Sequence, residues 1–446
     1  LRQSVTTRRR SDGLTHRIVG MLDGRACRDT IPGLEFAIVD EVDSVLVDEA
    51  RTPLILSERG TPYLSSDLLA RIMAHAQSLR PGKDVHPDPA RWTVDMSEAT
   101  LDRLHAAFGN ETRGPLSIPR LREELLRQAL MALHIYRPQE HYLVRDGKIG
   151  IVDEYTGRVM PDRSWRGGLH QMIELKEGCD VTDPLETLAS MTYQRFFRRY
   201  QRLAGMSGTV REVAAELWEV YDLDVAAVPT HQRPRRRVLA DRLFGNDAQK
   251  WQGIINHVAS LHGAGIPVLV GCRTVAGSQM ASEHLAAAGL THDVLNANAE
   301  AREAEIVARA GEAGRITVAT NMAGRGTDIA LGPGVAARGG LHVIMSERHD
   351  ARRIDRQLEG RCARQGDPGV FVAMLSIDDR LVLNIRPRAL GWLLRKVAHL
   401  APGIAGRWMF AFAQAQLERR NARLRAALIR ADKTQSTLLA LTGKAE

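Results

Sequence analysis

Short apolar runs alternate with helical patterns in the second half of the chain. We expect strands at Pro267–Gly271, Asp293–Asn296, Ile316–Ala319, Leu341–Met345 and Val370–Leu375, and helices at Ala276–Ala288, Ala301–Ala310 and Ala351–Glu359. Strands and helices that alternate at this spacing predict a parallel sheet covered by helices. An earlier apolar run, Phe36–Val39, ends in Asp40-Glu41 and predicts one more buried parallel strand. The chain is therefore expected to be an α/β protein.

Residues 60–165 differ in character from the rest of the chain. An amphipathic stretch at Leu116–Ala132 predicts a helix. Two short alternating segments, Tyr142–Val144 and Ile149–Val152, are separated by a turn that contains Asp146-Gly147. An Asp-Gly pair between two such segments is typical of a β-hairpin. This part of the chain is expected to form a small α+β insertion.

Further helices and a linker are expected before and after these strands, at 186–237 and from residue 389 onward. The pattern predicts one helix at 186–204 and another at Val210–Tyr221. Two prolines and a run of arginines at 229–237 predict a linker. From residue 389 the chain is expected to be helical, and the periodic, arginine-rich stretch Ala413–Asp432 predicts one long helix with an exposed face.

Composition narrows the class of protein. A length of 446 residues corresponds to roughly three domains, and 44% hydrophobic with 26% charged residues is typical of a globular protein. The four cysteines are far apart and form no CxxC pair, which argues against a disulfide framework or a structural zinc site. The sequence contains no run of 18 apolar residues, so we expect no membrane-spanning helix. The net charge of +8 favours an anionic partner, although a GC-rich coding bias toward arginine is an equal explanation.

The acid pair Asp40-Glu41 is the first candidate for chemistry. Ligands of open parallel sheets bind beyond the carboxyl ends of the strands. Asp40 would hold the water shell of a magnesium ion, and Glu41 would orient or deprotonate an attacking water. A solvated loop that merely carries acids is the alternative interpretation of this pair alone.

Two further constellations lie in the second half of the chain. Gly324 and Gly326 allow backbone amides to approach a ligand, Arg325 between them can pair with a phosphate, and Asp328 can accept from a ribose hydroxyl or from Arg325. Arg361 and Arg364 are three residues apart and would share a face of a helix, as a γ-phosphate sensor requires. Each motif alone is also compatible with a surface loop or a solvated pair. Their order is that of helicase-like motors that bind ATP between two RecA-like domains.

Long strings of sequence carry a closer resemblance. Asp40–Ile55 (DEVDSVLVDEARTPLI), Val152–Gly178, Leu203–Thr209 (LAGMSGT), Ala319–Gly332 (ATNMAGRGTDIALG) and Ser346–Gly369 resemble the SecA preprotein translocase motor family. The resemblance extends from about residue 33 to about residue 433.

This resemblance implies two RecA-like helicase-type lobes, the first incomplete, with an inserted α+β preprotein-crosslinking domain and a C-terminal helical scaffold segment. The implied boundaries are 1–57 for the Walker B part of the first lobe, 58–165 for the insertion, 166–229 for the rest of the first lobe, 230–385 for the second lobe and 386–446 for the scaffold.

The resemblance also implies roles for individual residues. Asp40 and Glu41 match the family's Walker B aspartate and catalytic glutamate, with Mg²⁺ held by Asp40 through water. Arg361 and Arg364 match the arginines that reach the γ-phosphate. The nucleotide-binding positions are Gly324, Arg325, Gly326 and Asp328, and the motif that couples hydrolysis to lobe movement is Ser207, Gly208 and Thr209.

The implied function is a motor that couples ATP hydrolysis, with Mg²⁺, to the movement of unfolded preproteins through the Sec channel. Such a protein would be cytoplasmic and peripherally associated with anionic phospholipid at the inner face of the bacterial cell membrane, and a homodimer is compatible with it. Nucleic acid is not expected as a partner. Two alternatives stay open, a helicase-like remodeller of nucleic acid and a non-catalytic remnant that binds preprotein.

Several positions depart from the family pattern. No GxxxxGK[ST] phosphate-binding loop occurs, and only 39 residues precede Asp40. We expect that Leu1 is not the native start and that this motif lies upstream; an ATP-incompetent homologue is the alternative. Glu359 replaces an arginine of the family, Cys362-Ala363 replaces Ser-Gly, and we expect Glu359 to weaken the sensor role of Arg361.

Overall fold

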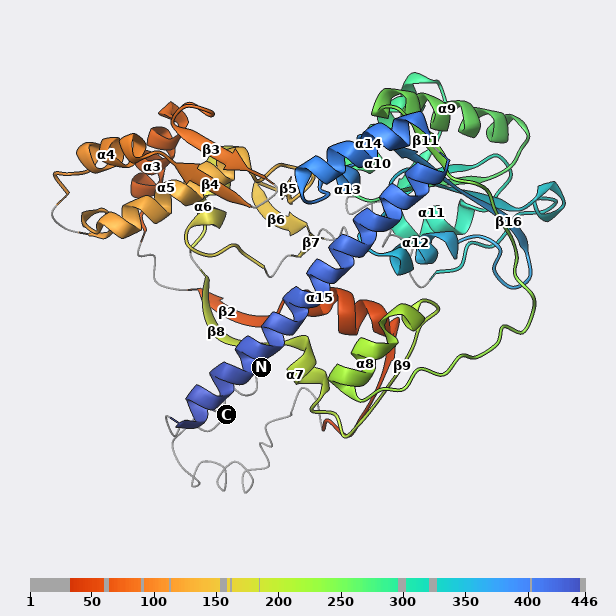
Figure 1. Ribbon diagram of the computed structural model, residues 1–446, viewed down its shortest axis with the longest axis horizontal. Helices are drawn as coiled ribbons and strands as arrows, with labels where there is room; N and C mark the ends of the chain where they lie inside the picture. Colours follow the sequence, from red (N-terminus) through yellow and green to blue (C-terminus); the bar gives the residue numbers. More distant parts are fainter. Residues whose placement is uncertain are drawn as a thin grey trace.

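The computed structural model describes most of the chain in ten segments. These are residues 33–59, 64–89, 92–111, 114–152, 159–160, 163–183, 185–295, 302–320, 327–401 and 403–441. Three packed units and one long helix are visible in Figure 1. We call residues 33–51 and 192–228 the first lobe, residues 64–183 the insertion and residues 230–385 the second lobe.

The second lobe is built on a seven-stranded parallel sheet. Its strands are β10 (Arg235–Val238), β11 (Arg242–Phe244), β12 (Val268–Cys272), β13 (Asp293–Leu295), β14 (Ile316–Thr320), β15 (Leu341–Met345) and β16 (Pro368–Ser376). The order is β10-β16-β15-β12-β14-β13, and β11 also pairs with β16. All residues of β12 and β14 are buried, because helices cover both faces of the sheet. The five strands predicted from residue 267 onward are confirmed.

Helices and apolar cores cover the two faces of this sheet. The helices are α9 (Asp247–Gly263), α10 (Val275–Ala287), α11 (Glu303–Arg309), α12 (Arg352–Glu359) and α13 (Arg380–Leu383). One core gathers Val268, Val270 and Ile344 beneath α9 and α10. The other gathers Val343, Met345 and Leu358 together with the first turns of the long C-terminal helix. The predicted α/β architecture of this lobe is therefore confirmed.

The first lobe holds a short parallel pair of strands. β1 (Phe36–Asp40) pairs with β9 (Arg202–Met206), with Asp40 opposite Met206. A π-helical turn, η1 (Ser44–Asp48), and a 3₁₀ turn, η2 (Glu49–Arg51), follow β1, while α7 (Tyr193–Phe197) and α8 (Ala214–Tyr221) flank β9. The predicted parallel strand is confirmed, but its expected burial is wrong, because Phe36 and Ile38 are more than half exposed and Val39 is buried.

The insertion has its own core. The helices and strands of the insertion are α3 (Ser66–Ser78), β3 (Val85–Asp88), β4 (Thr93–Met96), α4 (Glu98–Ala107), α5 (Pro119–His134), β5 (Tyr142–Arg145), β6 (Lys148–Val152), β7 (Val159–Met160) and α6 (Leu169–Glu177). The predicted β5–β6 hairpin is confirmed, and both residues of its Asp146-Gly147 turn have positive φ. Leu169, Met172 and Ile173 of α6 lie in the same core as α3 and α5, so the expected boundary at residue 165 falls inside this packing unit.

Two expectations for the connecting segments are wrong. Residues 186–204 do not form one helix: β8 (Leu185–Met191) pairs with β2 (Leu54–Arg59), α7 follows, and β9 completes the segment. The pairing partners of β8 and β9 lie more than a hundred residues earlier, so no local pattern indicates them. The expected linker at 229–237 ends in β10, which joins the second sheet beside β16.

The C-terminal helices connect the units. α14 (Arg388–Leu400) packs on the start of α15 (Ile404–Leu441), which runs diagonally from the second lobe past the first in Figure 1. With 38 residues, α15 is about 57 Å long. Its Gln414 donates to Asp355 of the second lobe, while Arg425 pairs with Glu216 of the first. The predicted long helix is confirmed and extends beyond Ala413–Asp432 at both ends. In the described part of the chain, no helix has the length and apolar character needed to cross a bilayer.

Candidate functional site

The acid pair lies where two parallel strands end side by side. Asp40 is the last residue of β1, and its neighbour Met206 is the last residue of β9, so Glu41 and Ser207 both emerge at the carboxyl edge. Asp40 Oδ1 accepts a hydrogen bond from the Glu41 N–H at 2.9 Å. Glu41 has φ of 50°, a left-handed conformation that is costly for a residue with a side chain and is concentrated at functional sites.

The Ser207-Gly208-Thr209 motif connects Glu41 to the interior. Ser207 Oγ donates to Glu41 Oε2 at 3.4 Å and accepts from the Thr209 N–H at 3.1 Å. Thr209 Oγ1 donates to Asp43 Oδ2 at 2.8 Å, and Asp43 is fully buried. A Cβ at Gly208 would meet open space, so packing does not require glycine there. The structure therefore brings the acid pair and this motif together.

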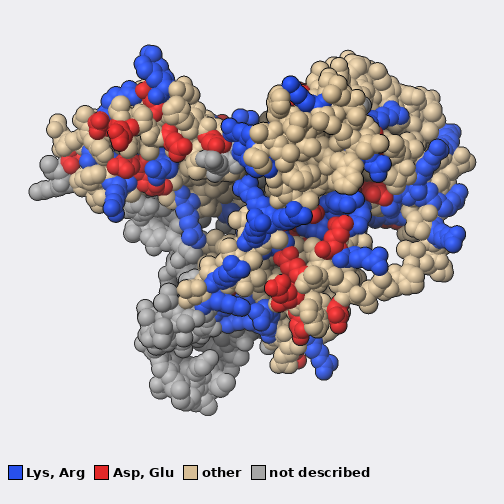
Figure 2. Space-filling model, in the orientation of Figure 1, with Lys and Arg blue, Asp and Glu red and all other residues tan. Residues whose placement is uncertain are grey.

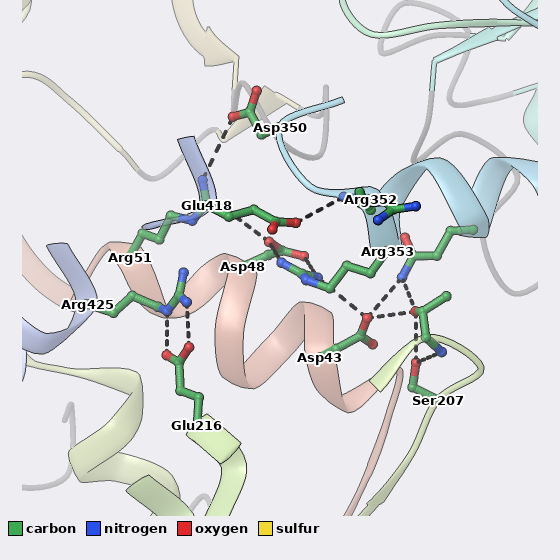
Figure 3. Close-up of polar contacts among 12 residues, drawn as sticks. Asp43, Asp48, Arg51, Ser207, Glu216, Asp350, Arg352, Arg353, Glu418 and Arg425 are labelled. Atoms are coloured by element: carbon green, nitrogen blue, oxygen red, sulfur yellow. Dashed lines mark hydrogen bonds and ion pairs between the residues drawn. The ribbon is translucent and has the colours of Figure 1, made fainter. Parts of the chain in front are cut away.

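Helix α12 of the second lobe closes this network. Arg353 binds Asp48 through both terminal nitrogens, at 2.5 Å for Nη1 to Oδ2, and Nη1 lies 3.5 Å from Asp43 Oδ2. One turn later, Gln357 Nε2 donates to Thr209 Oγ1 at 3.3 Å and to Asp43 at 3.5 Å. Figure 3 shows Arg353, Asp43 and Asp48 converging between the two ribbons.

Burial makes this contact between the lobes electrostatically strong. Arg353 is 3% exposed and Asp43 is fully buried. Burial disfavours the guanidinium charge, but the carboxylates of Asp48 and Asp43 outweigh it and raise the pKa of Arg353. Arg353, Asp48 and Gln357 were not identified from the sequence. The four-residue spacing of Arg353 and Gln357, which places both on one helix face, is the signal that points to them.

The second group of predicted residues surrounds a pocket of about 260 Å³ in the second lobe. Its lining includes Asp328, Arg361 and Arg364. Arg364 Nη1 lies 3.4 Å from Asp328 Oδ1, and Gln365 Nε2 donates to Asp328 Oδ2 at 2.9 Å. Arg361 is buried, with Nη1 donating to the Thr327 carbonyl at 3.4 Å. The structure therefore brings together Asp328 and both arginines.

One expectation about these arginines is wrong. α12 ends at Glu359, so Arg361 and Arg364 follow the helix and do not share a helical face. Glu359 is paired with Arg236 of β10 at 3.1 Å, because β10 joins the sheet beside the end of α12. The expected weakening of Arg361 by Glu359 stays a prediction, and Arg236 competes with Arg361 for the Glu359 carboxylate. Gly324, Arg325 and Gly326 lie outside the described residues.

The exposed carboxylate of Asp40 suits a magnesium ion that is also bound by nucleotide phosphates. In the described part of the chain, no group of three or more His, Cys, Asp or Glu side chains could enclose a metal ion. Magnesium bound together with nucleotide phosphates needs only one or two carboxylates and keeps several waters. Asp40 supplies an exposed carboxylate at the strand end, so the residues present fit this mode of binding.

Comparison with known proteins shows the family. Residues 6–218 match the SecA DEAD-like domain, and residues 234–337 and 333–399 match the SecA P-loop domain. The chain is 47% identical over 427 residues to the protein translocase subunit SecA 2 of Bordetella avium, covering 95% of this chain and 64% of that protein. It is 45% identical to SecA 3 of Magnetococcus marinus (93% and 64% covered) and 46% identical to SecA of Solidesulfovibrio magneticus (78% and 41% covered).

The chain therefore spans about 64% of the length of the first two of these relatives and less of the third. The two matched domain models together cover most of its residues, on both sides of the junction between the lobes. They support the helicase-type α/β fold. By these matches, the chain belongs to the SecA family.

Proposed function

We propose that this chain is a motor unit that couples ATP binding and hydrolysis to the translocation of unfolded preproteins across the cytoplasmic membrane through the Sec channel. One observation carries the proposal: a continuous set of contacts joins Glu41 to α12 of the other lobe through Ser207, Thr209 and Asp43. A motor needs such a connection between its hydrolytic group and the part that moves. The SecA matches favour this proposal over a remodeller of nucleic acid.

In this proposal each lobe supplies part of the ATP site. Mg²⁺, when bound, neutralises phosphate charge, and Asp40 would hold it through water. Glu41 would orient the attacking water and accept its proton, with Ser207 fixing its carboxylate. Arg361 and Arg364 would neutralise charge on the γ-phosphate.

Binding of the nucleotide itself is assigned to the second lobe. Asp328 lies within hydrogen-bond reach of Arg364 and Gln365, so its carboxylate is held in place at the pocket. Gly324, Arg325 and Gly326 immediately precede Thr327-Asp328 in sequence and are proposed to contact the nucleotide with it.

Ser207, Gly208 and Thr209 are proposed as the coupling element. Thr209 and Asp43 contact α12 through Gln357 and Arg353, so a shift of the second lobe must change the partners of Thr209. Thr209 in turn donates its N–H to Ser207, whose hydroxyl binds Glu41. A lobe movement is thereby transmitted to the hydrolytic carboxylate through two hydrogen bonds.

The insertion is proposed to be the preprotein-crosslinking domain. A cavity of about 710 Å³ lies between it, the second lobe and α15. Trp92 and His141 of the insertion, Leu383 of the second lobe and Leu424 of α15 line this cavity, together with several arginines. Arg380 pairs with Glu140 across it, which holds the insertion against the second lobe. An extended polypeptide would be held here by apolar and aromatic contacts, with α15 as the scaffold that connects the cavity to both lobes.

The proposed partners follow from this role. They are the unfolded preprotein, the Sec membrane channel and an anionic phospholipid surface, and the proposed location is the cytoplasm with peripheral association at the inner face of the membrane. A homodimer is compatible with the proposal.

Steady-state ATP turnover of the purified full-length protein tests this function, because residues 1–446 contain no GxxxxGK[ST] phosphate-binding loop. We expect turnover that an unfolded polypeptide stimulates and RNA does not, and we expect Glu41→Gln to abolish it, because glutamine cannot accept the proton of water. The matched control is Glu35→Gln, the same change on an exposed side chain just before β1. Stimulation by RNA instead of polypeptide would support a nucleic-acid remodeller. Polypeptide binding without any ATP turnover in the unmodified protein would support a non-catalytic preprotein-binding remnant.

A further inference from the structure

The large cavity between the insertion, the second lobe and α15 carries an excess of positive charge. Its volume of about 710 Å³ lies within the range of about 300–1,000 Å³ that is typical of small-molecule sites. Seven arginines and three acids line it, which leaves four positive charges in excess. Figure 2 shows Lys and Arg gathered where the insertion meets the second lobe. A ligand of this cavity is therefore expected to be an anion.

Each of the three acids is already paired with an arginine of the same lining. Asp350 Oδ1 lies 2.7 Å from Arg273 Nη2, and Asp88 Oδ1 lies 3.9 Å from Arg388 Nη2. The third acid forms the ion pair that holds the insertion against the second lobe. In the described part of the chain, the other four arginines of the lining pair with no carboxylate. These are Arg137, Arg386, Arg420 and Arg423.

Asn421 of α15 adds an unsatisfied polar group to this lining. Its side chain is 4% exposed, and its amide nitrogen is buried without a hydrogen-bond partner among the described residues. A buried amide without a partner is costly, because it has lost its bonds to water. Arg420 and Arg423 are three residues apart on the same helix, where like charges repel each other. A ligand that accepts hydrogen bonds and carries negative charge reduces both costs.

We propose that this cavity binds an oligophosphate, by which we mean a small molecule with two or more phosphate groups. A phosphate group concentrates about 1.5 to 2 negative charges and three acceptor oxygens at one point, so about two or three of them balance four arginines. Guanidinium groups bind phosphate through paired hydrogen bonds. An extended acidic polypeptide presents carboxylates on one side only at every second residue, about 7 Å apart, which suits clustered arginines less well. The pocket at Asp328 is lined by the second lobe alone, so the two sites are separate.

Binding of an oligophosphate does not depend on the proposed function, but one consequence of it rests on that function. An oligophosphate in the cavity would occupy the space that we assign to an extended polypeptide. We therefore expect it to displace an unfolded polypeptide from the protein. If an oligophosphate binds in the cavity and displaces no polypeptide, the oligophosphate site stands and the proposed position of the polypeptide is wrong.

Isothermal titration calorimetry with sodium tripolyphosphate tests the site in the purified full-length protein, without nucleotide or Mg²⁺. We expect saturable binding whose affinity falls as the salt concentration rises, because the contacts are ionic. Adenosine 3′,5′-bisphosphate is the second probe, since the phosphates can belong to an inorganic chain or to a nucleoside. Trp92 lines the cavity and is 37% exposed, so a base could stack on its ring. Weaker binding of the nucleoside probe alone in Trp92→Ala would indicate a nucleoside ligand, and an equal affinity of Trp92→Ala for both probes an inorganic one; both results support the site.

Paired substitutions on α15 locate the site. Arg420→Gln together with Arg423→Gln is expected to weaken tripolyphosphate binding about tenfold or more, because two charge-assisted contacts are lost. Both side chains are exposed, so the fold is expected to be retained. The matched control is Arg419→Gln together with Arg430→Gln, which removes two exposed arginines of the same helix that do not line the cavity. This pair is expected to change the affinity by less than about twofold at physiological salt, because distant exposed charges are screened. Asn421→Asp, which places a carboxylate in the lining, is expected to abolish binding.

Three results would overturn the proposal. The first is the absence of tripolyphosphate binding to the unmodified protein. The second is an equal loss of affinity in the cavity pair and in the control pair of substitutions, which would show general charge attraction without a site. The third is tighter binding of polyglutamate than of tripolyphosphate at equal total charge, lost in the cavity pair, which would assign the four arginines to the carboxylates of a polypeptide.

Discussion

Arg353→Met tests whether the lobes are held together by the buried charge cluster at α12. Arg353 binds Asp48 through both terminal nitrogens and approaches Asp43, and all three side chains are buried. Methionine keeps most of the apolar stem of arginine but removes the charge. The substitution therefore leaves Asp43 and Asp48 buried without their main cation.

The magnitude follows from what each carboxylate retains. Breaking a buried ion pair by removing one partner costs about 3–5 kcal/mol, because the remaining charge is uncompensated. Asp48 keeps Arg51 at 3.1 Å, and Asp43 keeps the Thr209 hydroxyl at 2.8 Å, so we expect the lower end of that range. About 3 kcal/mol corresponds to a shift of about a hundredfold in the equilibrium between closed and open lobes.

Hydrogen–deuterium exchange of the backbone amides in α12 and in residues 207–209 measures this opening. Arg353→Met is expected to accelerate exchange there by about a hundredfold and to leave the insertion unchanged. Arg356→Met is the matched control: Arg356 lies on the same helix and also reaches the first lobe, pairing with Glu212 at 2.7 Å, but its side chain is 44% exposed. An exposed pair contributes about 0–1 kcal/mol. Equal effects of the two substitutions would refute the role that we assign to burial.

Two further predictions concern the insertion and the first lobe. Burial lowers the pKa of His170 to about 4, so between pH 6.5 and pH 4 the unfolded chain binds more protons than the folded protein. The free energy of unfolding should therefore fall by about 3 kcal/mol as the pH falls through that window. Urea unfolding at several pH values should show this loss in the wild type and not in His170→Leu, and equal pH profiles of the two proteins would contradict it. At Gly205, a Cβ would lie 2.7 Å from the Val42 Cβ, so Gly205→Ala should lower the free energy of unfolding of the first lobe by about 1–3 kcal/mol. Gly208→Ala, where a Cβ meets open space, is its control, and a similar loss in both would reject the steric argument.

A helix or strand could be predicted where its sequence pattern is local, and not where it depends on pairing with a distant segment. The strands β12, β14 and β15 are continuous apolar runs bounded by helices, so their type and their parallel pairing could be predicted. The hairpin β5–β6 is encoded in its Asp146-Gly147 turn. In contrast, residues 186–204 contain no break in a pattern compatible with a helix until Gly205, and only pairing with distant β2 and β1 makes β8 and β9 strands.

The positions of the candidate site residues could likewise be predicted only where the signal is local. Asp40 and Glu41 could be expected at the carboxyl end of a parallel strand. Ser207 could not be placed beside them, because it follows β9, a strand that exists only through its pairing with β1. The contacts of Arg353 and of Glu359 could not be predicted, because each depends on how two separately folded elements dock. Glu359 illustrates the point: Arg361 lies only two residues away in sequence, but the strand that carries Arg236 supplies its partner.

Helix α12 connects the site to the long helix as well as to the first lobe. On one side, Arg353 and Gln357 contact Asp48 and Thr209. On the other, the buried Asp355 accepts from Gln414 of α15 at 2.7 Å, and the Arg352 N–H donates to Glu418 at 3.0 Å. Any displacement of α12 must therefore change contacts with both the first lobe and α15.

This arrangement gives a physical route from the pocket that we propose to bind nucleotide to the cavity of the insertion. Arg361 follows the end of α12 by two residues, so a ligand that pulls on its guanidinium acts on the helix directly. α15, which receives that displacement, lines the large cavity with Leu417 and Leu424. Leu417 lies between its two contacts with α12, at Gln414 and Glu418, and Leu424 lies less than two turns beyond Glu418. A rigid helix that touches both places transmits movement without requiring the insertion to contact nucleotide. If the route is correct, breaking the α12–α15 contact with Gln414→Leu should uncouple polypeptide-stimulated ATP turnover from its basal rate. Gln252→Leu, which removes a hydrogen bond to Asn256 within α9, should not.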